Sequence, residues 1–198
     1  MEPRIFPIHP PSATLFGKVL AASFGLTTAF FGVLTLALYA AIDPDGPVAH
    51  LAAPVALGSS YVLMLIIFFS VFTWFYLSAR RTDFVLLEGH LLIRNSAHGK
   101  HFTYDELKVE EARVVDLSAE PQYRPGGKIF AISAFFFRAG AFYLHSGEKA
   151  HVFYTGTPRA VYIPMHGSHA LLLGPADPAV FLHALREVRA TGRSPLPT

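Results

Sequence analysis

The sequence predicts an α+β membrane protein, in which a two-helix transmembrane hairpin is followed by an antiparallel β-barrel or sandwich capped by a C-terminal α-helix. Three observations support this fold class. The 198 residues are 52% hydrophobic and only 15% charged, which is more apolar than a typical soluble domain. Two long uncharged segments hold much of this apolar excess. Short strand-like runs, separated by Gly-containing turns, come after them.

The two uncharged segments, residues 19–42 and 51–79, form the predicted hairpin. At about 1.5 Å of rise per residue, either helix can cross a hydrocarbon core of roughly 30 Å. A cleaved signal peptide is the alternative for the first segment, but its apolar run is too long and the residues before it are rich in Pro. The pattern divides the chain into a Pro-rich N-terminal arm (1–13), a transmembrane hairpin (14–80, with helices at about 14–42 and 51–79), a β domain (81–191) and a C-terminal tail (192–198).

The charges beside the hairpin predict its orientation. The connection between the helices contains Asp43 and Asp45 but neither Lys nor Arg, whereas Arg80 and Arg81 directly follow the second helix. Positively charged residues favour the cytoplasmic side of a membrane. We therefore expect both termini and the β domain to lie in the cytoplasm.

The predicted helices lack the polar groups that membrane transport requires. The two uncharged segments contain no Asp, Glu, Arg or His, and the nearest cation, Lys18, lies at a helix end where it can reach the interface. Proton relays and ion pathways need titratable groups inside the bilayer. This composition argues against a pump or a transporter, and against haem ligation within the membrane.

A stripe of small residues marks the first helix. Its members recur at a spacing of four residues: Gly17, Ala21, Gly25 and Ala29. Small side chains at this spacing let another helix approach closely. Two interpretations stay open. The stripe either contacts a helix of another membrane protein, or packs within the hairpin against the aromatic half of the second helix, around Phe68 and Phe72.

Short strands and one helix make up the predicted β domain. Asp83–His90 and Leu91–Arg94 indicate a β-hairpin. Further strand-like runs follow at residues 108–117, 139–145, 150–154, 160–164 and 169–173. Asp177 and Pro178 then mark a helix start as N-cap and first helical residue. The apolar face of this helix contains Val180, Phe181, Ala184, Leu185 and Val188.

This order of elements resembles the bacterial pleckstrin-homology-like (PH-like) proteins of the inner membrane. The likeness covers roughly Thr82 to Arg189 and is carried by the segments Leu86–Arg94, Phe102–Leu107, Arg138–Tyr154, Ala160–Pro164 and Asp177–Leu185. It implies a PH-like β domain and a location in the bacterial cytoplasmic membrane. It also implies an assembly or accessory role in a larger membrane complex, of which photosynthetic and respiratory complexes are the most plausible kinds.

An apolar run departs from this resemblance. Similar family members often have a Gly- and Pro-rich turn where this chain has Ala131–Phe137. The run and its flank supply a candidate contact patch for a partner or for the membrane surface: Phe130, Phe135, Phe136 and Phe137. The alternative is that these side chains are core residues of a strand.

Basic side chains supply a second candidate surface. The candidate contacts to anionic lipid headgroups are Arg80, Arg81, Arg124, Lys128 and Arg138. Each basic residue near a membrane surface contributes on the order of 1 kcal/mol of attraction. Because the hairpin already tethers the domain, these contacts are expected to orient it.

No catalytic or metal-binding signature stands out. The chain has no Cys, and its two closely spaced His pairs, His98 with His101 and His166 with His169, have no helical His-Glu scaffold. We expect surface histidines, with no metal, no cofactor and no enzymatic activity. A net charge of +2 is too small to indicate nucleic-acid binding.

Two functional hypotheses follow. The first is a non-catalytic, membrane-anchored scaffold or accessory subunit that binds and stabilises other integral membrane proteins through its hairpin and its PH-like domain. The alternative is a lipid- or ligand-sensing PH-like membrane module. Self-association into a homo-oligomer through the same surfaces is a third, weaker hypothesis.

Overall fold

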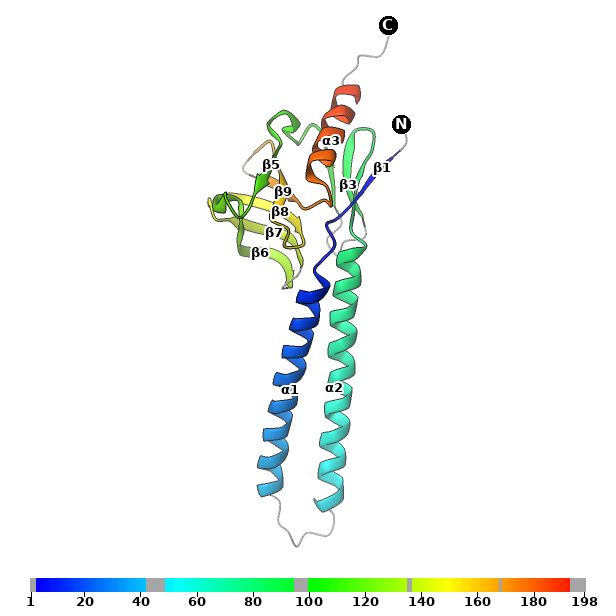
Figure 1. Ribbon diagram of the computed structural model, residues 1–198, viewed down its shortest axis with the longest axis vertical. Coiled ribbons are helices and arrows are strands. Elements are labelled where there is room, and N and C mark those ends of the chain that lie inside the picture. The colour runs from blue at the N-terminus through cyan, green and yellow to red at the C-terminus, as the bar shows by residue number, and fades with distance from the viewer. Residues whose placement is uncertain (1–2, 42–48, 95–99, 135–136, 168, 193–198) are drawn as a thin grey trace. The chain divides into compact units, whose positions relative to one another are not determined.

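The computed structural model describes residues 3–41, 49–94, 100–134, 137–167 and 169–192 (Figure 1). The chain divides into two compact units. The helical unit is Ala13–Phe75, and the β unit combines Met1–Ser12 with Tyr76–Thr198. The segment that precedes the first helix therefore belongs to the same unit as the segment that follows the second.

The two predicted apolar helices are confirmed. They are α1 (Ala13–Ala41) and α2 (Ala49–Arg80), and they run side by side in Figure 1. Ala13–Leu38 and Gly58–Arg80 are each long and apolar enough to span a membrane. In the most apolar stretch of α1 no residue is buried, and in that of α2 only 6% of the residues are buried.

The helices contact each other along one face. The half-buried residues of α1 recur every three or four positions, as do those of α2. Phe24 packs against Phe69 with ring centroids 6.4 Å apart. Tyr61 lies 5.1 Å from Phe31 between ring centroids, and its hydroxyl forms a 2.6 Å hydrogen bond with the hydroxyl of Thr28. This bond satisfies two polar groups on otherwise apolar helices.

The first sheet of the β unit has the order β1-β2-β3-β4 and is antiparallel throughout. Its strands are β1 (Arg4–Pro7), β2 (Asp83–Leu86), β3 (His90–Arg94) and β4 (His101–Thr103). The β2–β3 hairpin agrees with the sequence prediction. Residues 1–13, predicted as a separate arm, instead include β1, which pairs with β2 in the register Phe6↔Phe84.

The second sheet has the order β5-β9-β10-β8-β7-β6. Its strands are β5 (Arg113–Asp116), β6 (Pro125–Ala134), β7 (Phe137–Leu144), β8 (Lys149–Tyr154), β9 (Arg159–Pro164) and β10 (His169–Leu173). β10 lies between β8 and β9. It is antiparallel to β9 and parallel to β8. Of the two predicted forms, barrel or sandwich, the described strands form no closed barrel, because both sheets stay open. The antiparallel pattern is also broken at one strand pair, β8 with β10.

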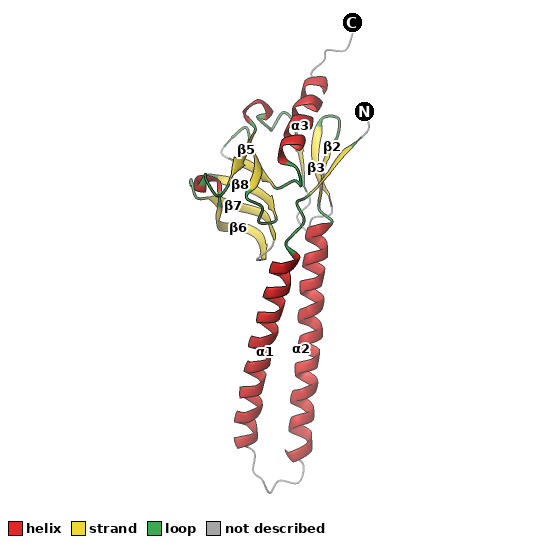
Figure 2. Ribbon diagram, in the orientation of Figure 1, coloured by secondary structure: helices red, strands yellow, loops and turns green. Residues whose placement is uncertain are grey.

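A C-terminal helix packs on the sheets as predicted. In α3 (Pro178–Gly192), the carboxylate of Asp177 accepts hydrogen bonds from the backbone N–H groups of Ala179 at 3.0 Å and Val180 at 3.1 Å. The buried Phe181 makes edge contacts with Phe6 on β1 and Phe84 on β2, at 5.3 and 5.8 Å between ring centroids. Figure 2 shows α3 beside these strands. Val180, predicted for the apolar face, is 56% exposed.

A hydrophobic cluster covers one face of the second sheet. Its buried members are Val115, Leu117, Phe142, Leu144, Ala150, Val152, Ala160, Ala170 and Leu172. The connection from β5 to β6 crosses this cluster and contains the short 3₁₀ helix η2 (Pro121–Tyr123). Since β5 and β6 form opposite edges of the sheet, this crossing segment links the two edges.

Candidate functional site

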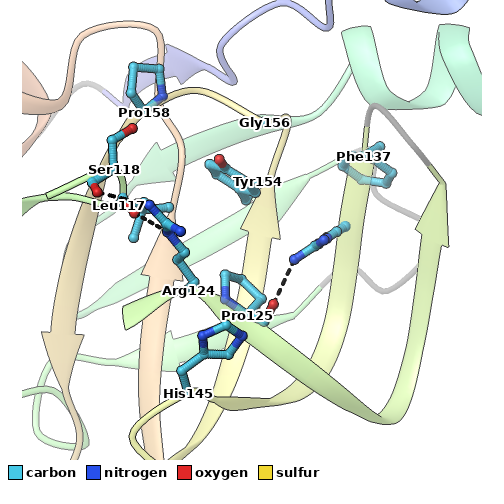
Figure 3. A pocket seen from close by; sticks show the side chains of 10 residues that line it. Leu117, Ser118, Arg124, Pro125, Phe137, His145, Tyr154, Gly156 and Pro158 are labelled. Carbon is cyan, nitrogen blue, oxygen red and sulfur yellow. Dashed lines mark hydrogen bonds between the residues drawn. The ribbon is translucent and has the colours of Figure 1, made fainter. Parts of the chain in front are cut away.

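A pocket of about 610 Å³ lies in the β unit, beside the segment that crosses the second sheet. Its lining residues are Leu117, Ser118, Arg124, Pro125, Phe137, Arg138, His145, Tyr154, Gly156 and Pro158. Figure 3 shows Arg124, Pro125, His145 and Tyr154 around the same space. The volume falls in the range of small-molecule sites in proteins.

The crossing segment positions Arg124. Arg124 is the C-cap residue of η2 and directly precedes β6, and its backbone is extended. Its Nε donates to the backbone carbonyl of Leu117, and its Nη2 donates to that of Ser118 at 2.8 Å. Leu117 is fixed in turn, because its N–H donates to the carbonyl of Pro158 at 2.7 Å. The guanidinium group of Arg124 is therefore held in one place by backbone atoms.

Strand register positions Arg138. On β7 it lies directly opposite Tyr154 of β8, so the two side chains share one face of the sheet. The two-residue period of a strand places Arg138 on the same face as the buried Phe142 and Leu144. Its Nη1 donates to the carbonyl of Pro125 at 2.7 Å. A second guanidinium group is thus held at the end of the hydrophobic cluster.

The two arginines have no carboxylate partner among the described residues. The acidic side chains nearest to Arg124 in sequence are engaged elsewhere: Asp116 accepts from the N–H of Ser118 at 2.8 Å, and Glu120 accepts from the N–H of Asp116 at 3.2 Å. Glu148, the nearest to Arg138, accepts from the Tyr162 hydroxyl at 2.8 Å. Burial raises the pKa of Tyr154, and the positive charges of Arg138 and Arg124 oppose that rise. The pocket is therefore electropositive around the Tyr154 hydroxyl.

A glycine shapes the strand that carries Arg138. Gly140 has a φ of +123°, and a Cβ built on it would lie 2.5 Å from the carbonyl oxygen of Phe130. The pairing of β6 with β7 shifts register between Lys128 and Phe130. Only glycine accommodates this backbone and this close approach together.

The structure brings together only part of the predicted headgroup surface. Arg124 and Arg138 line the pocket, whereas Lys128 is exposed on β6 and is not among the lining residues. Arg80 and Arg81 are exposed at the end of α2, where the Arg80 guanidinium lies 5.8 Å from the centre of the Tyr76 ring. Tyr154, His145 and Ser118 were not predicted as site residues, because only the strand register and the crossing segment place them here.

The predicted phenylalanine patch is corrected at one end. Phe137 is 2% exposed, which favours the alternative interpretation of a core residue in a strand. Phe130 is 75% exposed, which is compatible with a contact. Phe135 and Phe136 lie outside the described residues.

The small-residue stripe does not pack within the hairpin. Gly17, Ala21, Gly25 and Ala29 are all exposed, and a Cβ built at Gly17 or Gly25 meets no atom within 4 Å. Further along α1, a groove of about 450 Å³ is lined by Gly32, Thr35, Leu36 and Ala40. This side of α1 is open from the stripe to the groove.

The predicted histidine pairs form no cluster in the part of the chain that the structure describes. His101 and His166 are exposed, and His98 lies outside the described residues. A different pair meets on neighbouring strands: the rings of His151 and His169 stack at 6.1 Å, and Lys100 Nζ lies 3.4 Å from the ring nitrogens of His151. Burial, Lys100 and His169 lower the pKa of His151 to about 4. Among described residues, no group of three or more His, Cys, Asp or Glu could hold a metal ion.

Comparisons with protein-family models, with curated proteins and with solved structures find no match to this chain. The resemblance to PH-like proteins therefore rests on the sequence segments alone. What the structure supports is a pair of candidate transmembrane helices joined to a β unit with two open sheets and a C-terminal helix.

Proposed function

We propose that this chain is a non-catalytic scaffold or accessory subunit of a bacterial inner-membrane complex, with a photosynthetic or respiratory complex as the most plausible kind. Its hairpin anchors it and contacts other integral membrane proteins, and its β unit lies in the cytoplasm together with both termini. The observation that carries this proposal is the open, apolar, small-residue side of α1.

Exposed apolar side chains support the membrane anchor. Leu26 and Leu36 of α1 are each 75% exposed, and Ile66 and Trp74 of α2 are each 58% exposed. Water disfavours such a continuous apolar surface, whereas lipid tails solvate it. Because the uncharged segments contain no Asp, Glu, Lys, Arg or His, anchoring explains these helices better than transport does.

The unused side of α1 supports a helical partner. Within the hairpin, Phe24, Thr28 and Phe31 contact α2, so the contact between the two helices leaves the stripe free. In a bilayer, helices associate by close van der Waals packing at small residues. We therefore assign this side to a transmembrane helix of a different protein, and a second copy of this chain is the competing occupant.

The proposal also treats the β unit as a variant of the PH-like fold. A four-stranded antiparallel sheet, a second sheet and a terminal helix support that view. The parallel pairing of β8 with β10 is a departure from an all-antiparallel arrangement. The β unit would then be the part of the subunit that meets cytoplasmic surfaces of the complex.

Affinity purification from native membranes in a mild detergent tests the proposal. A tagged wild-type chain is expected to retain one or more integral membrane proteins, identified by mass spectrometry. Ala29→Leu adds bulk on the stripe and is expected to lose them, while the matched variant Ala37→Leu, exposed on α1 but off the stripe, is expected to keep them. A particle that contains only this chain, as a monomer or as an oligomer, would contradict the proposal.

The predicted orientation has its own test. Because the chain has no Cys, single cysteines report on accessibility without background. A cysteine at Glu88, in the turn between β2 and β3, is expected to react with an impermeant maleimide only from the cytoplasmic side. A cysteine at Asp45, between the helices, is expected to react only from the opposite side. The reverse pattern would overturn the assigned topology.

A further inference from the structure

We infer that the pocket beside the crossing segment binds a phosphate monoester group through the guanidinium groups of Arg124 and Arg138, with the Tyr154 hydroxyl as an additional donor. This site belongs to the β unit alone. It is independent of the helical contact proposed above, and it gives a chemical identity to the ligand of the alternative, sensing hypothesis.

Four arginines of the β unit pair with carboxylates, and Arg186 donates alone to the backbone carbonyl of Ala112, so Arg124 and Arg138 are set apart by sharing one pocket. Arg94 pairs with Asp83 at 3.0 Å, and Arg189 pairs with Asp105 at 2.9 Å. Arg4 and Arg113 likewise face Glu187 and Glu120. Arg124 and Arg138 instead donate only to backbone carbonyls among the described residues. Two cationic groups that share one pocket without a counter-charge favour an anionic ligand.

Both guanidinium groups are preorganised for a ligand. A guanidinium group offers several N–H donors in a planar fork that fits the oxygens of a phosphate. The carbonyls of Leu117, Ser118 and Pro125 occupy only part of this set and fix the orientation of both groups. Binding therefore costs little side-chain entropy, and donors remain for the ligand.

The charge and the size of the pocket also fit an organic phosphate. Two positive charges match a phosphate monoester, which carries close to two negative charges near neutral pH. The Tyr154 hydroxyl is half-buried and has no hydrogen-bond partner among the described residues, so it can donate to a third oxygen. A pocket of about 610 Å³ exceeds what a phosphate group alone fills. The apolar walls, including Leu117, Phe137 and Pro158, suit a compact organic portion of the ligand.

Isothermal titration of the full chain in nanodiscs tests the site. In phosphatidylcholine nanodiscs, glycerol 3-phosphate serves as a soluble phosphate monoester. Nanodiscs that also contain phosphatidic acid present a phosphate monoester on a lipid. If this lipid already occupies the pocket, the heat of glycerol 3-phosphate binding is lost. If glycerol 3-phosphate still binds in the presence of phosphatidic acid, the ligand of the site is a free phosphate ester. If phosphatidic acid blocks this binding, the site accepts a lipid headgroup.

Substitutions distinguish a specific binding site from general electrostatic attraction of anions. Arg124→Gln and Arg138→Gln are each expected to weaken binding about tenfold or more, since each removes charge-assisted hydrogen bonds. Tyr154→Phe removes one hydroxyl and is expected to weaken binding less. Lys128→Gln removes the same charge from an exposed position outside the pocket and is expected to leave binding unchanged.

Two results would overturn the inference. One is the absence of glycerol 3-phosphate binding to the wild-type chain in phosphatidylcholine nanodiscs. The other is an equal loss in Lys128→Gln and in the two arginine variants, which would mean diffuse electrostatic attraction. If Arg138→Gln does not fold, as judged by its thermal transition, Arg124→Gln and Tyr154→Phe are compared with Lys128→Gln instead.

Discussion

The helical unit and the β unit treat apolar side chains in opposite ways. In the helical unit, large apolar residues such as Leu36 are 75% exposed, and polar groups are few and satisfied locally. In the β unit, Phe84, Phe142 and Phe153 are each at most 1% exposed, while charged side chains lie at the surface. The difference matches the proposed membrane anchor, since lipid solvates exposed apolar side chains and water drives them into a core. Within each unit one feature stands apart from these patterns: the small-residue side of α1, and the pocket that Arg124 and Arg138 share.

Truncating one phenylalanine in each unit is the strongest test of this comparison. Phe142→Ala removes a side chain that is 1% exposed in the β unit and is expected to lower the free energy of unfolding by about 3–5 kcal/mol. Phe30→Ala removes a side chain that is 65% exposed on α1 and is expected to change stability little in detergent. Thermal unfolding followed by near-UV circular dichroism measures both. Equal losses would mean that α1 is buried in a protein core.

The close approach of β6 to β7 gives the next largest effect. Gly140→Ala forces a Cβ against the Phe130 carbonyl and strains a residue with φ of +123°, so we expect a loss of about 3 kcal/mol of unfolding free energy. Gly127→Ala, on β6, is the matched control. Its Cβ would have its nearest contact at 3.9 Å, with the Tyr143 side chain, and we expect little change. Urea unfolding compares the two, and a stable Gly140→Ala protein would contradict the described register.

Mild acid is expected to weaken the β unit through His151. Its pKa is lowered to about 4 by burial, Lys100 and His169, so the unfolded chain binds a proton near pH 6.5 that the folded chain does not. Stability is therefore expected to fall as the pH drops from about 6.5 towards 4. His151→Gln should reduce this dependence, and His166→Gln, at an exposed position, should not. Melting temperatures across this pH range check the prediction, which fails if both variants keep the wild-type slope.

The hydrogen bond within the hairpin gives the smallest effect. Thr28→Val removes the partner of the Tyr61 hydroxyl, and Tyr61→Phe removes the hydroxyl while keeping the ring contact with Phe31. A double-mutant cycle in detergent, read by helicity during denaturation, is expected to give a coupling energy of about 0.6 kcal/mol. A coupling energy of zero would indicate that the two hydroxyl groups do not meet in the hairpin.

Local patterns in the sequence were sufficient to predict several elements. Uninterrupted apolar runs predicted α1 and α2, and Asp177 with Pro178 predicted the start of α3, since these signals lie within a few residues of the structure that they cause. The strand β1 was missed because its partner β2 lies beyond the whole hairpin, and Pro7 suggested an extended arm. Long-range pairing leaves no mark in a short window of sequence.

The candidate site could be predicted only in part for the same reason. Arg124 and Arg138 stood out as basic residues, but Lys128 stood out equally, and only the structure separates the two that enter the pocket. Tyr154 was identified as a site residue only from the strand register that places it opposite Arg138. For the phenylalanine run, the sequence left a contact patch and a strand core both open, because a run of aromatic residues does not reveal which of them are buried, as Phe137 is, or exposed, as Phe130 is.

The most direct test of the proposed role is photo-crosslinking in native membranes. A photo-reactive amino acid at Ala29, on the open stripe of α1, is compared with the same residue at Ala37. We expect the Ala29 probe to crosslink one defined integral membrane protein other than this chain, and the Ala37 probe to give no such product. Crosslinks to lipid alone, or to a second copy of this chain alone, at Ala29 would contradict the proposal that the hairpin holds a subunit in a larger membrane complex.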